Sequence, residues 1–167
     1  MKRYLFTILV LSIIISSGCD NIICKYRKLP DLGNGYKFET SDCKGLSITD
    51  SNNTVMIPSL ILYYAFDSTF IIAAQRSWDS IPNIRKMTYY KAHKAFETST
   101  IVQYWILNKK EKNEYIGVDT VRKRRTGTFE VRAIYSNVYG PYKWKEYLQK
   151  RKELGVPKEL KLKKKEY

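Results

Sequence analysis

The densest apolar pattern beyond the first twenty residues runs over residues 60–75, LILYYAFDSTFIIAAQ. Two runs rich in β-branched and aromatic residues flank Asp67-Ser68-Thr69, which predicts a β-hairpin connected at these three polar residues. Both runs are apolar at consecutive positions, so we expect the hairpin at the centre of a sheet, covered on both faces. One long helix is the alternative, but the β-rich composition and the polar break count against it.

Shorter patterns predict further strands on either side of this hairpin. Residues 101–107 (IVQYWIL) and 114–118 (EYIGV) enclose the wholly polar segment 108–113 (NKKEKN), which predicts a second hairpin. Other segments alternate apolar and polar side chains, as half-buried strands do, or are short runs beside a turn. These segments are residues 35–40 and 129–135, and two short strands at 46–49 and 54–57 around a turn at 50–53.

Two segments have helical patterns. Residues 85–97 (RKMTYYKAHKAFE) predict a short amphipathic helix. Residues 141–154 predict a C-terminal helix, because a proline suits the first helical position and Gly155 suits the residue past the end. On this helix Trp144 and Leu148 lie on the stripe that we expect to pack on the sheet.

Together these elements predict an α+β fold: a mostly antiparallel sheet of five to seven strands with the C-terminal helix packed on one face. We assign a single domain to residues 35–157, because no Gly/Ser-rich or Pro-rich linker divides this stretch. The remaining residues, 158–167 (KELKLKKKEY), are expected to form an exposed basic tail.

The N-terminus has the three parts of an export signal. Lys2 and Arg3 precede an uncharged run over residues 5–15, and small residues follow at 16–18. A transmembrane helix is the alternative, but eleven residues at 1.5 Å each span only about 16 Å of a hydrocarbon layer of ~30 Å. The pattern therefore predicts a cleaved signal peptide.

The end of this signal resembles the lipobox of bacterial lipoproteins, carried here by Ser17, Gly18 and Cys19. The resemblance implies that residues 1–18 are the signal peptide, that Cys19 carries a covalent lipid, and that residues 19–34 are a tether. Two or more acyl chains, at about 0.8 kcal/mol per buried methylene, anchor a protein stably in a membrane. The expected location is the cell envelope, facing the periplasm or the surface, and ordinary secretion is the alternative.

Two cysteines, Cys24 and Cys43, remain once Cys19 is assigned to the lipid. In an oxidising compartment they form a candidate disulfide, worth about 3 kcal/mol in the chain-entropy model, and two free thiols are the alternative. We predict no metal site, because the chain has no CxxC motif and His93 is the only histidine. We predict no cofactor beyond the lipid.

The charge balance points to an anionic partner. After loss of the signal peptide the chain has 28 basic and 16 acidic residues, formally +12. Export counts against nucleic acid, and a basic domain held at a membrane feels the surface potential within a Debye length. We expect contact with anionic lipid headgroups, acidic glycans or an envelope protein. The densest basic run, Arg122, Lys123, Arg124 and Arg125, is the candidate anion-binding patch, and a solvated hairpin tip is the alternative.

Aromatic residues suggest a second function. Adjacent aromatic side chains in a strand point to opposite faces, so one ring of each pair would lie outward and could stack on sugars. The chain could then be a glycan-binding module, although the same pairs also suit a packed sheet. The pairs are Tyr63 with Tyr64, Tyr89 with Tyr90, and Tyr104 with Trp105.

We predict no catalytic residue. His93 lies between lysines and has no carboxylate closer in sequence than Glu97, so a surface role is favoured over that of a general base. The chain contains no G-x-S-x-G elbow and no Gly-rich phosphate loop. The acids lie in expected turns and on a basic helix rather than as a pair converging in a cleft. A hydrolase with an unrecognised site is the second alternative.

Two segments carry a family resemblance: residues 104–117 (YWILNKKEKNEYIG) and residues 138–162, which begin with VYGPY. Together with the lipobox they resemble a family of small bacterial lipoproteins defined as a domain of unknown function. The resemblance covers about two-thirds of the chain after the signal peptide. It implies a small tethered domain and no chemistry, so no catalytic residue is transferred from it.

Overall fold

The computed structural model describes residues 29–41, 45–58, 60–122 and 129–164. These residues form the predicted α+β fold, with strands that pair antiparallel throughout. The strands are β1 (Lys37–Ser41), β2 (Gly45–Thr49), β3 (Val55–Ile57), β4 (Ile61–Phe66), β5 (Phe70–Gln75), β6 (Gln103–Asn108), β7 (Tyr115–Arg122), β8 (Phe129–Tyr135), β9 (Val138–Tyr142) and β10 (Lys163–Lys164). The helices are α2 (Tyr89–Thr98) and α3 (Trp144–Glu153), with 3₁₀ turns η2 (Trp78–Ser80) and η3 (Ile84–Lys86).

The largest sheet has five strands in the order β10-β4-β5-β6-β9. The predicted first hairpin is confirmed as β4 and β5, and the Asp67 carboxylate shapes its turn by accepting the N–H groups of Thr69 and Phe70, both at 2.7 Å. Strand β5 is buried on both faces, as predicted. Strand β4 is not, because alternate residues remain partly open and Tyr63 is 38% exposed.

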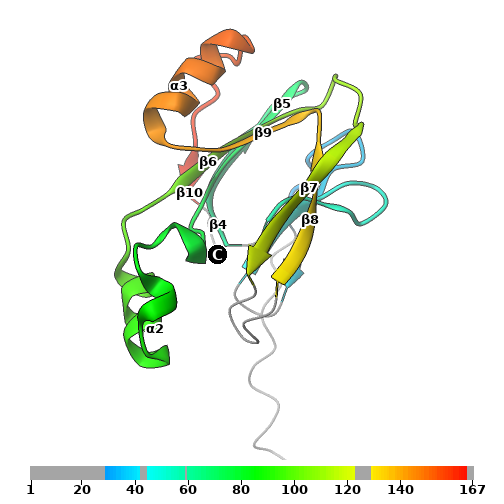
Figure 1. The fold of residues 1–167 in the computed structure, drawn as a ribbon. Helices are drawn as coiled ribbons and strands as arrows, with labels where there is room; N and C mark the ends of the chain where they lie inside the picture. The colour runs from blue at the N-terminus through cyan, green and yellow to red at the C-terminus, as the bar shows by residue number, and fades with distance from the viewer. Residues whose placement is uncertain (1–28, 42–44, 59, 123–128, 165–167) are drawn as a thin grey trace, which may run out of the picture.

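The five-stranded sheet separates two layers (Figure 1). On one face lie the β1-β2-β3 sheet and the β7-β8 ribbon, and on the other lie α3 and the C-terminal segment. The first core contains Leu32, Ile48, Ile71, Trp105 and Leu107, among others. The second contains Ile72, Ile106, Tyr147 and Val156, among others. Alternate residues of β5 and β6 therefore serve opposite cores.

The predicted second hairpin is wrong. Residues 101–107 and 114–118 contribute to strands, but β6 pairs with β5 and β9, whereas β7 pairs with β8 in a separate two-stranded sheet. The polar segment between them leads the chain away from the central sheet, and β9 occupies the edge that the hairpin would have used. The pattern predicted the strands but not their partners.

The C-terminal helix exists, but its start and its buried face differ from the prediction. Pro141 lies in β9, after a cis peptide bond, and α3 begins at Trp144. Tyr147 is the fully buried contact with the sheet, while Trp144 and Leu148 are exposed. Trp144 and Leu148 are exposed because they lie about 60–100° around the helix from Tyr147, which faces the sheet.

Both ends of the predicted domain extend further than expected. Leu32, assigned to the tether, is fully buried in the first core, because it is apolar and its carbonyl accepts a hydrogen bond from Lys109 Nζ at 2.7 Å. Leu160 and Leu162, assigned to the basic tail, pack against the second core, and β10 pairs with β4. The alternating LKLK pattern explains this: leucines point inward and lysines outward.

The amphipathic helix predicted within residues 85–97 is confirmed as α2, preceded by η3. Ala92 and Phe96 form its buried stripe and join a small separate cluster with Ile81 and Ile84. The α2 helix therefore lies beside the two main cores as a third packing unit.

Candidate functional site

The most basic described segment is the last one, residues 143–164, which holds nine basic and three acidic residues. Helix α3 forms its first half and lies against β6 and β9 (Figure 1). Tyr147 fixes the helix to the sheet by burying its ring among Tyr104, Tyr139 and Tyr142. The rest of the helix surface is left for solvent or a partner.

Charges are separated between the two exposed flanks of α3. Successive helical residues turn by about 100°, so residues on either side of Tyr147 lie on distinct flanks. One flank carries Trp144, Lys145, Leu148 and Lys152, with no acid among them. The other carries Glu146, Gln149 and Glu153.

The acids of the second flank are paired within the helix. Glu146 Oε2 accepts the backbone N–H of Lys143 at 3.0 Å and caps the N-terminus. Lys150 Nζ lies 3.1 Å from Glu153 Oε2, and Gln149 Nε2 donates to Glu153 Oε1 at 3.0 Å. These hydrogen bonds, first from Lys150 and then from Gln149, lower the pKa of the Glu153 carboxyl. The cations of the first flank are thus free of acidic neighbours on α3.

Aromatic rings adjoin the basic flank. Trp144 is 50% exposed, and its ring centroid lies 5.1 Å from that of Tyr104 and 5.6 Å from that of Tyr147. Tyr104 pairs across the sheet with Ala74, and Ala74 pairs with Tyr63, so both tyrosines lie on the α3 side of the sheet. Burial, and secondarily the proximity of Tyr63, raises the pKa of Tyr104.

We refer to these residues as the aromatic–basic surface. It combines exposed or partly exposed rings from β4, β6 and α3 with two lysines seven residues apart on the helix. Its members are Tyr63, Tyr104, Trp144, Lys145, Leu148 and Lys152.

A second polar network lies near the other side of α3 and joins β9 to β6 and the segment that follows it. Tyr139 donates its hydroxyl to Glu111 Oε2 at 2.6 Å, and Asn108 Nδ2 donates to Glu111 Oε1 at 2.8 Å. Burial, reinforced by the hydrogen bond with Glu111, raises the pKa of Tyr139 to about 12. Lys150 Nζ lies 5.1 Å from the centre of the Tyr139 ring. Of these contacts, only that of Lys150 comes from α3; the others hold β9 to β6.

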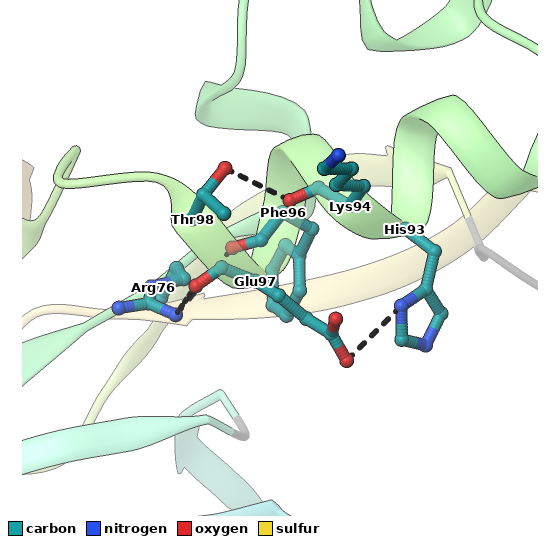
Figure 2. A network of polar contacts seen from close by, with 6 residues as sticks. All are labelled: Arg76, His93, Lys94, Phe96, Glu97 and Thr98. Atoms are coloured by element: carbon teal, nitrogen blue, oxygen red, sulfur yellow. Dashed lines mark hydrogen bonds and ion pairs between the residues drawn. The ribbon is translucent and has the colours of Figure 1, made fainter.

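The surroundings of His93 are those of a helix surface (Figure 2). His93 Nδ1 lies 3.1 Å from Glu97 Oε1, one turn along α2. At the end of the helix, Arg76 Nη1 donates to the carbonyls of Phe96 and Glu97 at 3.4 and 3.2 Å, and Thr98 Oγ1 donates to the carbonyl of Lys94 at 2.9 Å. The two Arg76 contacts go to carbonyls among the last four of α2, which an α-helix leaves without intrahelical partners. Among the described residues, no group of three or more His, Cys, Asp or Glu side chains could hold a metal ion.

The aromatic pairs follow the predicted alternation in strands. Tyr63 is exposed on one face and Tyr64 packs edge-on against Phe38 at 4.6 Å on the other. Likewise Tyr104 lies toward α3, while Trp105 is buried on the opposite face. The third pair, at residues 89–90, differs because it begins helix α2, where neighbouring side chains are about 100° apart and both can be exposed.

The sequence-predicted sites lie mainly outside the described residues. Cys19 and Cys24 fall within 1–28, Cys43 within 42–44, and Lys123 to Arg125 within 123–128. Arg122 ends β7, but its side chain is not described. Lipidation, the disulfide and the Arg122–Arg125 patch therefore stay predictions.

The aromatic–basic surface was missed because Trp144 and Leu148 were assigned to the core. A helical projection centred on Tyr147 would have identified the acid-free flank. The contribution of Tyr63 could not be found in this way, since it depends on strand register.

No family model, curated protein or solved structure matches this chain. Within the described ranges, no helix is long and apolar enough to cross a membrane.

Proposed function

We propose that this chain is a lipid-anchored, non-enzymatic protein of the bacterial cell envelope whose folded domain binds an anionic envelope component. The observation that carries the binding proposal is the acid-free flank of α3, which belongs to a segment with a formal charge of +6 over residues 143–164. Attraction between such a surface and an anionic layer is appreciable within about one Debye length, roughly 8–10 Å at physiological salt.

The anchor is proposed from the sequence. Lipid on Cys19 would keep the domain at high local concentration beside its partner, so a weak electrostatic contact would suffice. The folded domain begins before residue 32, which leaves a short connection between Cys19 and the first buried residue. The domain would therefore work close to the membrane.

Metabolic labelling with palmitate tests the anchor. We expect label in the wild-type chain and in Cys24→Ala, which is the matched control, and no label in Cys19→Ala. A wild-type chain without label would refute the anchor.

Sedimentation with isolated envelopes tests the anionic contact. Residues 20–167, which lack the predicted signal peptide and Cys19, should bind envelopes at about 0.05 M salt and be released at about 0.5 M, where the Debye length falls to roughly 4 Å. Binding that does not change with salt would refute an electrostatic contact.

A further inference from the structure

We infer that the aromatic–basic surface binds an acidic polysaccharide, with sugar rings stacked on Trp144 and Tyr63 and anionic groups held by Lys145 and Lys152. This inference rests on the proposed function and names its partner class.

The rings provide a supported platform. Trp144 is half exposed, yet its indole rests against Tyr104, which stacks on the buried ring of Tyr147 at 4.9 Å. Because the helix N-terminus is fixed by the Lys143–Glu146 hydrogen bond, the indole is positioned before a ligand arrives. Preorganised aromatic faces bind the apolar C–H faces of sugars at a small entropic cost.

The lysines add a requirement for negative charge. Lys145 and Lys152 are separated by seven residues, a rise of about 10.5 Å along α3. That distance is similar to the length of a disaccharide, so successive anionic groups along a polymer could meet both lysines. The acids of α3 lie on the opposite flank and are already hydrogen-bonded, so they do not repel such a ligand.

The position of the aromatic–basic surface in the fold favours a polysaccharide, rather than the anchoring membrane, as its binding partner. The described chain enters at Leu29, which packs against the first core, and α3 covers the opposite face of the central sheet (Figure 1). The ten residues 19–28 can span at most about 33–36 Å when fully extended. Because the described chain begins on the face opposite α3, a lipid on Cys19 would direct the aromatic–basic surface away from the anchoring bilayer.

Reconstitution of the lipidated full chain tests this inference. The chain is placed in neutral phosphatidylcholine vesicles, and three fluorescent probes are added in turn: polygalacturonate, neutral dextran, and separate vesicles containing phosphatidylglycerol. We expect strong recruitment of polygalacturonate, little recruitment of dextran, and weaker docking of the anionic vesicles.

Variants on matched helices locate the site. Trp144→Ala should weaken polygalacturonate binding about tenfold, the equivalent of one lost stacking contact, and Trp144→Phe should recover most of it. The pair Lys145→Ala and Lys152→Ala should weaken binding about fivefold and reduce its salt dependence. On α2, Tyr89→Ala and the pair Lys91→Ala with Lys94→Ala remove an exposed aromatic ring and two exposed lysines, and should leave binding unchanged.

Each failure has its own meaning. Equal loss in the α2 controls would show that binding is not located at the aromatic–basic surface, and no effect of Trp144→Ala would show that charge alone drives binding. Either result would overturn this inference while leaving the proposed function intact. Preference for anionic vesicles would overturn it in favour of a membrane partner. A chain that does not stay on neutral vesicles would refute the lipid anchor, and polygalacturonate binding would then be measured with the chain captured on beads.

Discussion

Replacing Lys109 with methionine removes a buried ammonium group that joins two distant parts of the fold. Lys109 is 8% exposed, and its Nζ donates to the carbonyls of Leu32, at 2.7 Å, and of Asp67. It also lies 5.8 Å from the centre of the Phe66 ring. The side chain therefore fastens the beginning of the domain to the turn of the β4-β5 hairpin.

We expect Lys109→Met to destabilise the fold, because the two backbone carbonyls lose their hydrogen-bond donor. Burial lowers the pKa of Lys109, so holding the charge has a desolvation cost that methionine would relieve. Each lost hydrogen bond to a charged donor removes about 1.5–3 kcal/mol, and the two backbone carbonyls stay buried without that donor. Replacement of a buried polar pair is neutral only when both partners become apolar, and a carbonyl cannot. We expect a net loss of about 2–4 kcal/mol, a large part of a typical stability of about 5–15 kcal/mol.

Urea unfolding of residues 20–167, followed by tryptophan fluorescence, measures this loss, because Trp105 is buried in the core that Leu32 joins. Lys110→Met is the control, since its side chain is exposed and a surface change of this kind stays within about 0.5 kcal/mol. Hydrogen exchange should show that Leu32 loses protection first. If Lys109→Met were as stable as wild type, the two carbonyl contacts would be energetically unimportant and the reasoning would be refuted.

Three further substitutions test the packing beneath α3. Gly140→Ala should destabilise the fold by about 3 kcal/mol, because its φ is +136° and a Cβ would lie 2.7 Å from the Tyr104 carbonyl oxygen; an unchanged melting temperature would contradict this. Tyr147→Ala should lose about 3–5 kcal/mol in urea unfolding and release α3, because a fully buried ring is removed. For Tyr139, the pKa raised from 10.0 to about 12 means that folding favours the neutral phenol, so its contribution is present below pH 10 and disappears as pH rises toward 12. Tyr139→Phe, which cannot donate a hydrogen bond to Glu111, should lower the free energy of unfolding by about 1 kcal/mol at pH 8. Its stability should also fall less steeply than that of wild type as the pH rises above 10. A fall as steep as in wild type would exclude Tyr139 as the source of the alkaline loss of stability.

Local patterns predicted most of the strands and helices. They did not predict strand pairing between segments that are far apart in the sequence. The β4-β5 hairpin is encoded within sixteen residues, so its sequence contains both strands and the turn that joins them. The edge of β6 is different, because β9 (VYGPY) has no alternating pattern, and nothing local to residues 101–118 predicts that β9 rather than β7 pairs with β6. Gly140 supplies part of the discrimination, because without a side chain it can lie close to the indole of Trp105 and to the carbonyl of Tyr104 on β6.

The start of α3 shows how a correct local rule can lose to tertiary structure. Proline at residue 141 suits a first helical turn, but the close contact of Gly140 with β6 keeps the chain extended through Tyr142. The helix then begins where Glu146 can cap the N–H of Lys143. Trp144 lies at the surface because the helix packs on the sheet through Tyr147, about 60° around the helix from Trp144, and this packing leaves the candidate site exposed.

The separation between buried and exposed aromatics makes the binding proposal testable without loss of the fold. Tyr147 and Gly140 lie beneath α3 and support the helix, whereas Trp144 has half of its surface in solvent and Lys145 and Lys152 lie on the outer flank. Truncating Lys145 and Lys152 removes little buried area, so their stability effects should stay within about 1 kcal/mol. Trp144→Ala also removes the buried half of the indole and its contacts with Tyr104 and Tyr147, and should cost about 1–3 kcal/mol. A binding defect measured where Trp144→Ala is still folded would therefore report on recognition, whereas a defect that appears only with unfolding would place the indole in the structural support of the helix.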